Sequence, residues 1–187
     1  MSKHIALIQN PGTNVQLHKD IWDLVGGTKR EWLFQRTGST VFVSSSVPFP
    51  GSVEAQDTYA PGTKLAYQVK VDAVRRHKGK NRNSVKDHEL SQWFEERFEG
   101  NGFEIAGVPR VTEIRDINFN KDDGTPIHYH AVTFEGKLIV SDTELFRKLL
   151  HEGAKRGKSY GLGLFLVKPI QSSTATNNNA KQGVSND

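Results

Sequence analysis

The order in which strand-like and helix-like segments follow one another constrains the fold of this chain more than any other feature of its sequence. Short apolar or alternating runs predict strands, and apolar residues at helical spacing predict helices. Residues 1–50 read strand, helix, strand, strand, and residues 64–170 read strand, helix, strand, strand, helix, strand. The second order is that of a complete ferredoxin-like unit, and the first is the same order without its last part. We therefore expect an α+β protein with tandem ferredoxin-like (RRM-like) domains, the first one reduced.

The segments outside these two units are predicted from their composition. Residues 51–63 follow a Pro-containing stretch and contain further proline and glycine, so we expect a linker there. Residues 171–187 are almost free of apolar side chains, and we expect a disordered tail. Within the units, we expect a helix over residues 16–25, a helix over residues 85–99 that is capped by Ser84, and a last strand over residues 162–167.

Composition narrows the possible chemistry. The 187 residues include no cysteine, which excludes disulfides and thiolate metal sites and fits a reducing compartment. No apolar run approaches the roughly 20 residues of a membrane span, and no signal pattern is visible at the start, so we expect a cytoplasmic protein without a membrane partner. The net charge of +4 is small, so the position of the charges matters more than their sum.

Lysines and arginines concentrate in one short segment of the second half. Its cations are Arg75, Arg76, Lys78, Lys80, Arg82 and Lys86. No acidic residue separates them before Asp87. Such a cluster suits phosphate contacts, although a solvated loop is an equally simple interpretation.

A second basic segment contains Lys155, Arg156, Lys158 and Ser159 among three glycines. Glycines let the backbone approach a ligand closely, and the cations suit phosphate. The order of elements is wrong for a Walker loop, because the segment lies between a predicted helix and a predicted strand. The alternative interpretation is a helix end followed by a tight turn.

Three histidines are candidates for chemistry. His18 lies at the edge of the apolar stripe of the first helix, where packing steadies one side of the ring and leaves the other exposed. His128 and His130 lie on one face of a strand, but no third metal ligand stands nearby in the sequence, so we favour no metal site. A lone histidine at a helix edge usually has no special role, so His18 needs further support.

That support comes from a resemblance. Residues 130–169 read HAVTFEGKLIVSDTELFRKLLHEGAKRGKSYGLGLFLVKP and resemble the C-terminal signature of the CasE-type CRISPR endoribonucleases, with its FEG strand and its glycine-rich loop. The stretch from Val15 to His18 resembles the start of the family's first helix, and residues 65–80 resemble its strand and basic loop.

The resemblance implies a fold of two ferredoxin-like domains and a metal-independent, cofactor-free RNase. Such an enzyme binds the CRISPR repeat hairpin and cuts at the 3′ base of the stem by attack of the RNA's own 2′-hydroxyl. It implies catalytic roles for His18, Lys158 and Ser159, and RNA contacts from Arg75, Arg76, Lys78, Lys80, Arg82, Lys155 and Arg156. The implied partners are the crRNA 3′ hairpin and other Cascade-type subunits, namely backbone and Cas5-like proteins. Target DNA is reached only through that complex.

One departure from the family pattern leaves alternatives open. Val15 stands where the family usually has a tyrosine, three residues before the histidine. A non-cleaving, hairpin-binding subunit of a CRISPR complex is therefore the main alternative to an RNase. An RNA-binding ferredoxin-like protein unrelated to CRISPR and a metal-dependent hydrolase are the others.

Overall fold

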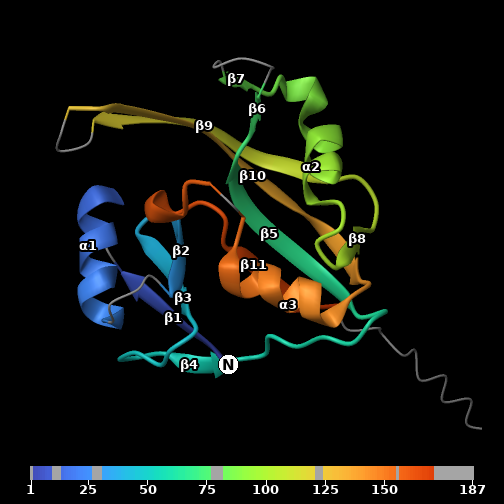
Figure 1. Ribbon diagram of the computed structural model, residues 1–187, viewed down its shortest axis with the longest axis horizontal. Coiled ribbons are helices and arrows are strands. Elements are labelled where there is room, and N and C mark those ends of the chain that lie inside the picture. Colours follow the sequence, from blue (N-terminus) through green and yellow to red (C-terminus); the bar gives the residue numbers. More distant parts are fainter. Residues whose placement is uncertain are drawn as a thin grey trace, which may run out of the picture.

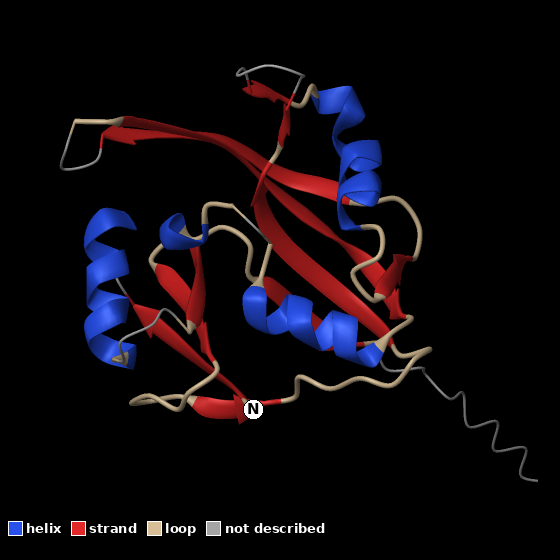
Figure 2. Ribbon diagram, in the orientation of Figure 1, coloured by secondary structure: helices blue, strands red, loops and turns tan. Residues whose placement is uncertain are grey.

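Two large antiparallel sheets, one from each half of the chain, form the framework of the structure (Figures 1 and 2). The computed structural model describes residues 2–9, 14–26, 31–76, 82–120, 124–154 and 156–170, without the side chains of residues 14, 15, 76 and 82. None of the helices in these ranges is long and apolar enough to cross a membrane. The fold is of the α+β class, as expected.

The first domain is a ferredoxin-like sheet that lacks one helix. Its elements are β1 (Lys3–Gln9), α1 (Asn14–Val25), β2 (Trp32–Thr37), β3 (Thr40–Ser45) and β4 (Val53–Ala55). The strands lie in the ferredoxin-like order β2-β3-β1-β4, and residues 46–52 between β3 and β4 hold no helix. The domain is reduced, as expected, but it keeps its fourth strand inside the segment that we expected to be a linker.

Helix α1 packs its apolar face on the first sheet. Leu17 and Ile21 lie one turn apart on this face and are fully buried in a cluster with Phe34 and Val41. Burial of these side chains fixes the rotation of the helix about its axis. It therefore also fixes the direction in which the neighbouring His18 projects.

The second domain is a complete ferredoxin-like unit with two additions. Its elements are β5 (Lys64–Asp72), β6 (Val74–Arg76), β7 (Arg82–Ser84), η1 (Asp87–Glu89), α2 (Leu90–Phe98), β8 (Phe103–Ile105), β9 (Arg110–Asn120), β10 (Pro126–Val140), α3 (Thr143–Glu152), η2 (Lys158–Tyr160) and β11 (Phe165–Pro169). The sheet order is β11-β5-β10-β8, and β9 also pairs with β10. The second strand of the unit is thus split into β8 and β9. The small hairpin β6–β7 is the other addition.

Two predicted boundaries in this domain were wrong. Ser84 does not cap a helix, because it ends β7 and pairs with Val74, and the α-helix begins only at Leu90 after a 3-10 turn. The last strand begins at Phe165 rather than at residue 162. Gly161 and Gly163 adopt φ values of 82° and 91°, which extended L-residues do not, so the loop continues past them.

The hairpin of β9 and β10 extends well beyond the second sheet (Figure 1). β10 pairs with β5 only from Ala131 to Ile139, whereas its pairing with β9 begins at Pro126. The part of the hairpin before Ala131 is therefore a two-stranded arm. One side of this arm carries Tyr129, which packs near Tyr160 of η2, with ring centroids 5.5 Å apart.

The chain between α3 and β11 crosses to the first domain. Its short helix η2 lies against α1 and β2. Gly161 follows η2, and a Cβ atom added there would lie 2.9 Å from Cε2 of the buried Phe34. Only glycine fits at this approach of backbone to ring. The loop after α3 is therefore packed into the edge of the first domain's core.

The segment after β4 is fastened to α3. The carboxylate of Asp57 lies 2.7 Å from Nε2 of His151 and 3.2 Å from Nε of Arg147. Lys3 of β1 donates to the carbonyl oxygen of Leu150 at 3.3 Å, and burial lowers the pKa of this lysine to about 8. These contacts hold both the first strand and the linker against the second domain.

Replacing Gly161 by alanine should cost more stability than the same change at Gly62. Both glycines have positive φ, 82° and 87°, but the Cβ position at Gly62 has open space around it. Only Gly161→Ala must displace Phe34, so we expect an additional loss of about 1–3 kcal/mol in the free energy of unfolding. Denaturant titration of both variants measures this, and equal losses would show that the loop does not press on Phe34.

The Asp57 cluster should make stability depend on pH. Burial alone would raise the pKa of Asp57, but hydrogen bonds from His151 and Thr58 and the charge of Arg147 lower it below its usual value. A lowered pKa in the folded state gives stability above the unfolded-state pKa of about 3.9 and loses it as the pH falls through the folded-state value.

We expect Asp57→Asn to cost about 2 kcal/mol at pH 7, and the gap to wild type to shrink progressively below about pH 4. Urea titrations across this pH range measure the gap. The exposed Asp87, changed to Asn, is the control and should show little effect at any pH. A gap for Asp57→Asn that stays constant with pH would mean that its charge is not the stabilising feature.

Candidate functional site

His18 lies half-buried on α1 in an aromatic surrounding. Its ring centroid is 5.1 Å from that of Trp32 and 6.4 Å from that of Trp22. Its Nδ1 atom is buried, so proton transfer with a substrate would have to use Nε2. The position at the edge of the helix's apolar face is the expected one. The aromatic surrounding was not expected, although Trp22, one turn after His18, is visible as a neighbour in the sequence.

Lys158 and Ser159 form the short helix η2 between two glycines in the left-handed region. Because η2 lies against α1 and β2, the structure brings the helix of His18 and the glycine-rich loop together across the boundary between the domains. Two of the three predicted catalytic residues thus lie in one loop beside the helix that carries the third.

Two hollows meet at Lys158. One, of about 400 Å³, lies between α2 and α3 and is also lined by Arg97 and Arg156. The other, of about 560 Å³, lies between β2 and α3 and is also lined by Trp32, the residue beside His18. A strand of nucleic acid lying in either hollow would pass the Lys158 side chain. The loop is therefore accessible as well as close to α1.

Arg156 is placed differently from what its sequence context suggested. Its Nη1 lies 2.6 Å from Oδ2 of Asp72, whose side chain is 1% exposed. Its guanidinium carbon lies 5.1 Å from the centroid of the Tyr129 ring. Asp72 was missed in the sequence because nothing in a half-buried strand marks one aspartate as a partner. Lys155 lies outside the described residues.

The basic hairpin forms a separate patch. Arg75 and Arg76 end β6 and Arg82 begins β7, whereas Lys78 and Lys80 lie outside the described residues. Arg75 lies 3.6 Å from Glu96 of α2, and its side chain is half-buried. In Figure 1 this hairpin stands beside α2, while α1 lies on the other side of the molecule. The structure thus separates the basic hairpin from His18.

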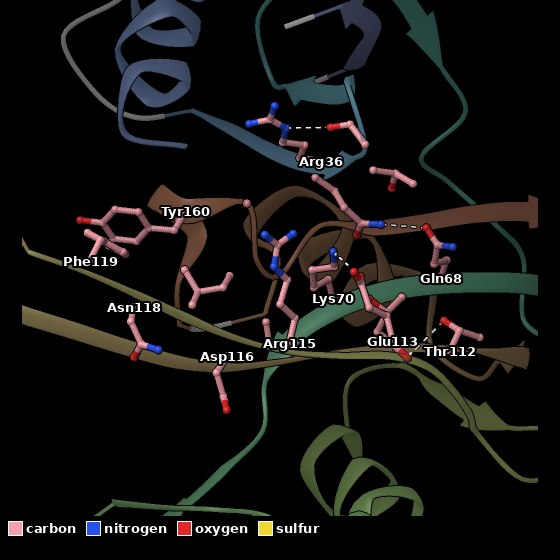
Figure 3. Close-up of a pocket in the computed structure, with 17 residues that line it drawn as sticks. Arg36, Gln68, Lys70, Thr112, Glu113, Arg115, Asp116, Asn118, Phe119 and Tyr160 are labelled. Carbon is pink, nitrogen blue, oxygen red and sulfur yellow. Dashed lines mark hydrogen bonds and ion pairs between the residues drawn. The ribbon is translucent and has the colours of Figure 1, made fainter. Parts of the chain in front are cut away.

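A third hollow, of about 700 Å³, lies between β2 and the open face of the second sheet (Figure 3). One of its cations forms an ion pair: Lys70 lies 2.7 Å from Glu113 and lowers the pKa of that carboxyl by its hydrogen bond. Amide side chains continue the pattern, because Gln35 donates to Gln68 at 2.8 Å. The lining thus mixes the cations Arg36, Lys70 and Arg115 with the acids Glu113 and Asp116.

The pair His128 and His130 does not gather further ligands. His130 Nδ1 lies 2.9 Å and His128 Nε2 lies 3.9 Å from Oδ1 of Asp116, and His128 Nδ1 also contacts Asn118 at 2.7 Å. Across the described ranges, no three His, Cys, Asp or Glu side chains are arranged to hold a metal ion. The pair is part of the polar side of the β9–β10 arm.

A comparison of the sequence with known proteins finds a relative that matches more than half of this chain. Over 121 residues, 58% of this chain, it is 30% identical to a protein of Thermus thermophilus named CRISPR-associated endoribonuclease Cse3, and the alignment spans 57% of that relative.

Solved structures share the whole fold. A chain described as CRISPR endoribonuclease Cse3 bound to a 19-nucleotide RNA superposes with a TM-score of 0.75 at 21% identity, over 90% of this chain and all of that one. Cas6e from Escherichia coli K-12 superposes with a TM-score of 0.66 at 21% identity, over 91% of this chain and all of that one. Both likenesses confirm the tandem ferredoxin-like arrangement.

The sequence from residue 13 to residue 169 matches the family model described as CRISPR associated protein. This match takes in α1, the second sheet, the glycine-rich loop and the first sheet apart from β1. The chain belongs to this family of CRISPR-associated proteins.

Proposed function

We propose that this chain is an endoribonuclease that binds the hairpin of a CRISPR repeat and cuts the RNA at the 3′ base of the stem without a metal ion. The observation that carries the proposal is the packing of η2, with Lys158 and Ser159, against the helix that bears His18. The family membership and the name of the Thermus relative, an endoribonuclease, support the same activity.

The chemistry requires little beyond this arrangement. The 2′-hydroxyl of RNA lies beside its own phosphate, so the nucleophile is already in place. It loses its proton and attacks phosphorus. The bond to the 5′-oxygen breaks and that oxygen takes up a proton, leaving a 2′,3′-cyclic phosphate and a 5′-hydroxyl. His18 serves one of the two proton transfers through Nε2, and Lys158 with the loop's N–H groups stabilises the charge that builds on the phosphate.

The rest of the molecule holds the hairpin. Arg75 of β6 and its basic neighbours contact the stem's phosphates. Base edges in the narrow major groove contribute little. Residues 1–50 then supply the histidine, and residues 64–170 supply the grip and the loop. Because a complex held by many phosphate contacts dissociates slowly, the protein stays on the crRNA 3′ hairpin after the cut.

A bound product would make the protein a subunit of a larger assembly. Matched structures include chains of a complex described as a CRISPR RNA-guided surveillance complex, at a TM-score of 0.69. We propose that this chain likewise joins backbone and Cas5-like subunits in a Cascade-type complex in the cytoplasm. Target DNA is contacted only through the assembled complex.

Cleavage of the source organism's repeat RNA in EDTA tests the activity. Wild type should cut at the base of the stem and leave a cyclic phosphate, whereas His18→Ala should cut at least about 100-fold more slowly, because proton transfer is lost. Hairpin affinity should change little, since one imidazole adds little to a many-phosphate contact. His88→Ala, a change at an exposed histidine, is the control and should cut normally.

Three other results would each contradict the proposal. Tight binding without any cutting would identify a structural subunit, the alternative that Val15 suggests. Loss of cutting in EDTA and its return with a divalent cation would indicate a metal-dependent hydrolase. Equal binding to the repeat and to an unrelated hairpin would indicate a general RNA-binding protein.

A further inference from the structure

Asp72 is a buried carboxylate at the point where three parts of the second domain meet. It is the last residue of β5, and its side chain is 1% exposed. Its Oδ1 atom accepts a hydrogen bond from the backbone N–H of His130 at 3.0 Å, next to the last rung of the β5–β10 ladder. Its Oδ2 atom lies 2.6 Å from Nη1 of Arg156 in the glycine-rich loop. One carboxylate therefore joins β5, β10 and this loop.

Arg156 is held from a second direction as well. Its guanidinium carbon lies 5.1 Å from the ring centroid of Tyr129 on β10, within the range of a cation–π contact. A planar guanidinium between a carboxylate and an aromatic face has few orientations left. The side chain is only 34% exposed, and the charge nearest to it is the buried Asp72. Its position suits an internal anchor better than a contact to solvent-borne phosphate.

The loop is fixed on the other side of η2 too. Tyr160 ends η2, and its ring lies 5.5 Å from Tyr129 and 4.5 Å from Phe119, both on the β9–β10 hairpin. Beyond it, the N–H of Gly163 donates to the carbonyl oxygen of Lys70 at 2.7 Å. Lys158 and Ser159 thus lie between two anchors: Lys158 is two residues after Arg156, and Ser159 directly precedes Tyr160.

From this geometry we infer that Asp72 is a positioning residue for RNA cleavage, and that it acts by clamping Arg156 so that Lys158 and Ser159 stay fixed beside α1. The inference rests on the proposed function, which supplies the reaction. If Asp72 clamps Arg156, then Arg156 is not one of the RNA contacts expected from the sequence. The clamp also explains why a protein that binds a polyanion keeps a carboxylate beside this loop.

The two roles of Arg156 predict opposite effects of Asp72. If Arg156 contacts RNA, Asp72 only weakens that contact, and Asp72→Asn should leave cutting and binding unchanged or improved. If Arg156 is the clamp, Asp72→Asn should slow cutting as Arg156→Gln does. Asparagine keeps an oxygen for the N–H of His130, so this substitution removes the ion pair and little else.

Single-turnover cleavage and hairpin affinity at several salt concentrations, measured on the full chain, separate these roles. We expect Asp72→Asn and Arg156→Gln each to slow cutting roughly tenfold or more, because small displacements of reacting groups cost large factors. We expect the double variant to be no slower than either single variant, because both remove one contact. Hairpin affinity and its salt slope should not change, and Arg156→Lys should retain more activity than Arg156→Gln.

Arg75→Gln is the matched control, since Arg75 belongs to the basic hairpin and is, like Arg156, a half-buried arginine paired with a carboxylate. It should weaken hairpin binding and reduce the salt slope by roughly 0.9, the effect expected for one lost phosphate contact. The same pattern in Arg156→Gln, with normal cutting by Asp72→Asn, would overturn the clamp.

Hydrogen exchange keeps the test independent of activity. In Asp72→Asn, the amides of residues 157–163 should exchange faster than in wild type, whereas those of α3 should not. If Asp72→Asn fails to fold, Arg156→Gln serves for the same measurement. Unchanged exchange in the loop would overturn the clamp even if the variant cuts the RNA slowly. If wild type does not cut the repeat RNA, the proposed function fails, and exchange alone then decides whether Asp72 holds the loop.

Discussion

The contact between the loop after α3 and the core of the first domain is the interaction on which the rest of the structure depends. Gly161 lets the backbone reach the ring of Phe34, and η2 lies against α1 as a result. Without this approach, the glycine-rich loop would belong to the second domain alone and His18 to the first alone. A site shared by two domains needs such a fixed boundary, because in-line attack tolerates only small errors in position. The Asp57 cluster and Lys3 hold the same boundary from the side of α3.

Ion pairs within the protein involve charged side chains at its hollows and at the basic hairpin. In the groove of Figure 3, Lys70 pairs with Glu113. In the hollow between α2 and α3, Arg156 pairs with Asp72, and Arg75 of the β6–β7 hairpin pairs with Glu96. An RNA that contacts these arginines must therefore compete with carboxylates of the protein.

Much of this architecture follows from patterns that a sequence displays directly. The helical spacing of Leu17 and Ile21 and the alternation along β5 predict their elements, because burial of one face is a local rule. The short strands β4 and β8 escape such rules, since three residues carry no period. Ser84 was misjudged because the return of the chain onto β6 depends on pairing rather than on local preference.

The residues of the candidate site likewise fall into those that the sequence alone indicates and those that only the packed structure reveals. His18 and the glycine-rich loop can be picked out because their residue types and spacing are unusual, and the resemblance to a family gave them roles. Trp32 and Asp72 could not be found, because their contacts with His18 and Arg156 arise only when separate strands are packed together. Arg156 shows the limit most clearly: its charge predicts an RNA contact, and nothing in the sequence points to its ion pair with Asp72.

In the proposed reaction, His18 and Lys158 act on one phosphate from opposite sides of the domain boundary. Single-turnover cleavage of the repeat hairpin by His18→Ala, Lys158→Ala and the double variant tests it most directly. Groups that act as a unit lose their effect together, so the double variant should be scarcely slower than the slower single variant. A double variant slowed by the full product of the two single effects would mean that the residues act independently, and the shared site would be contradicted.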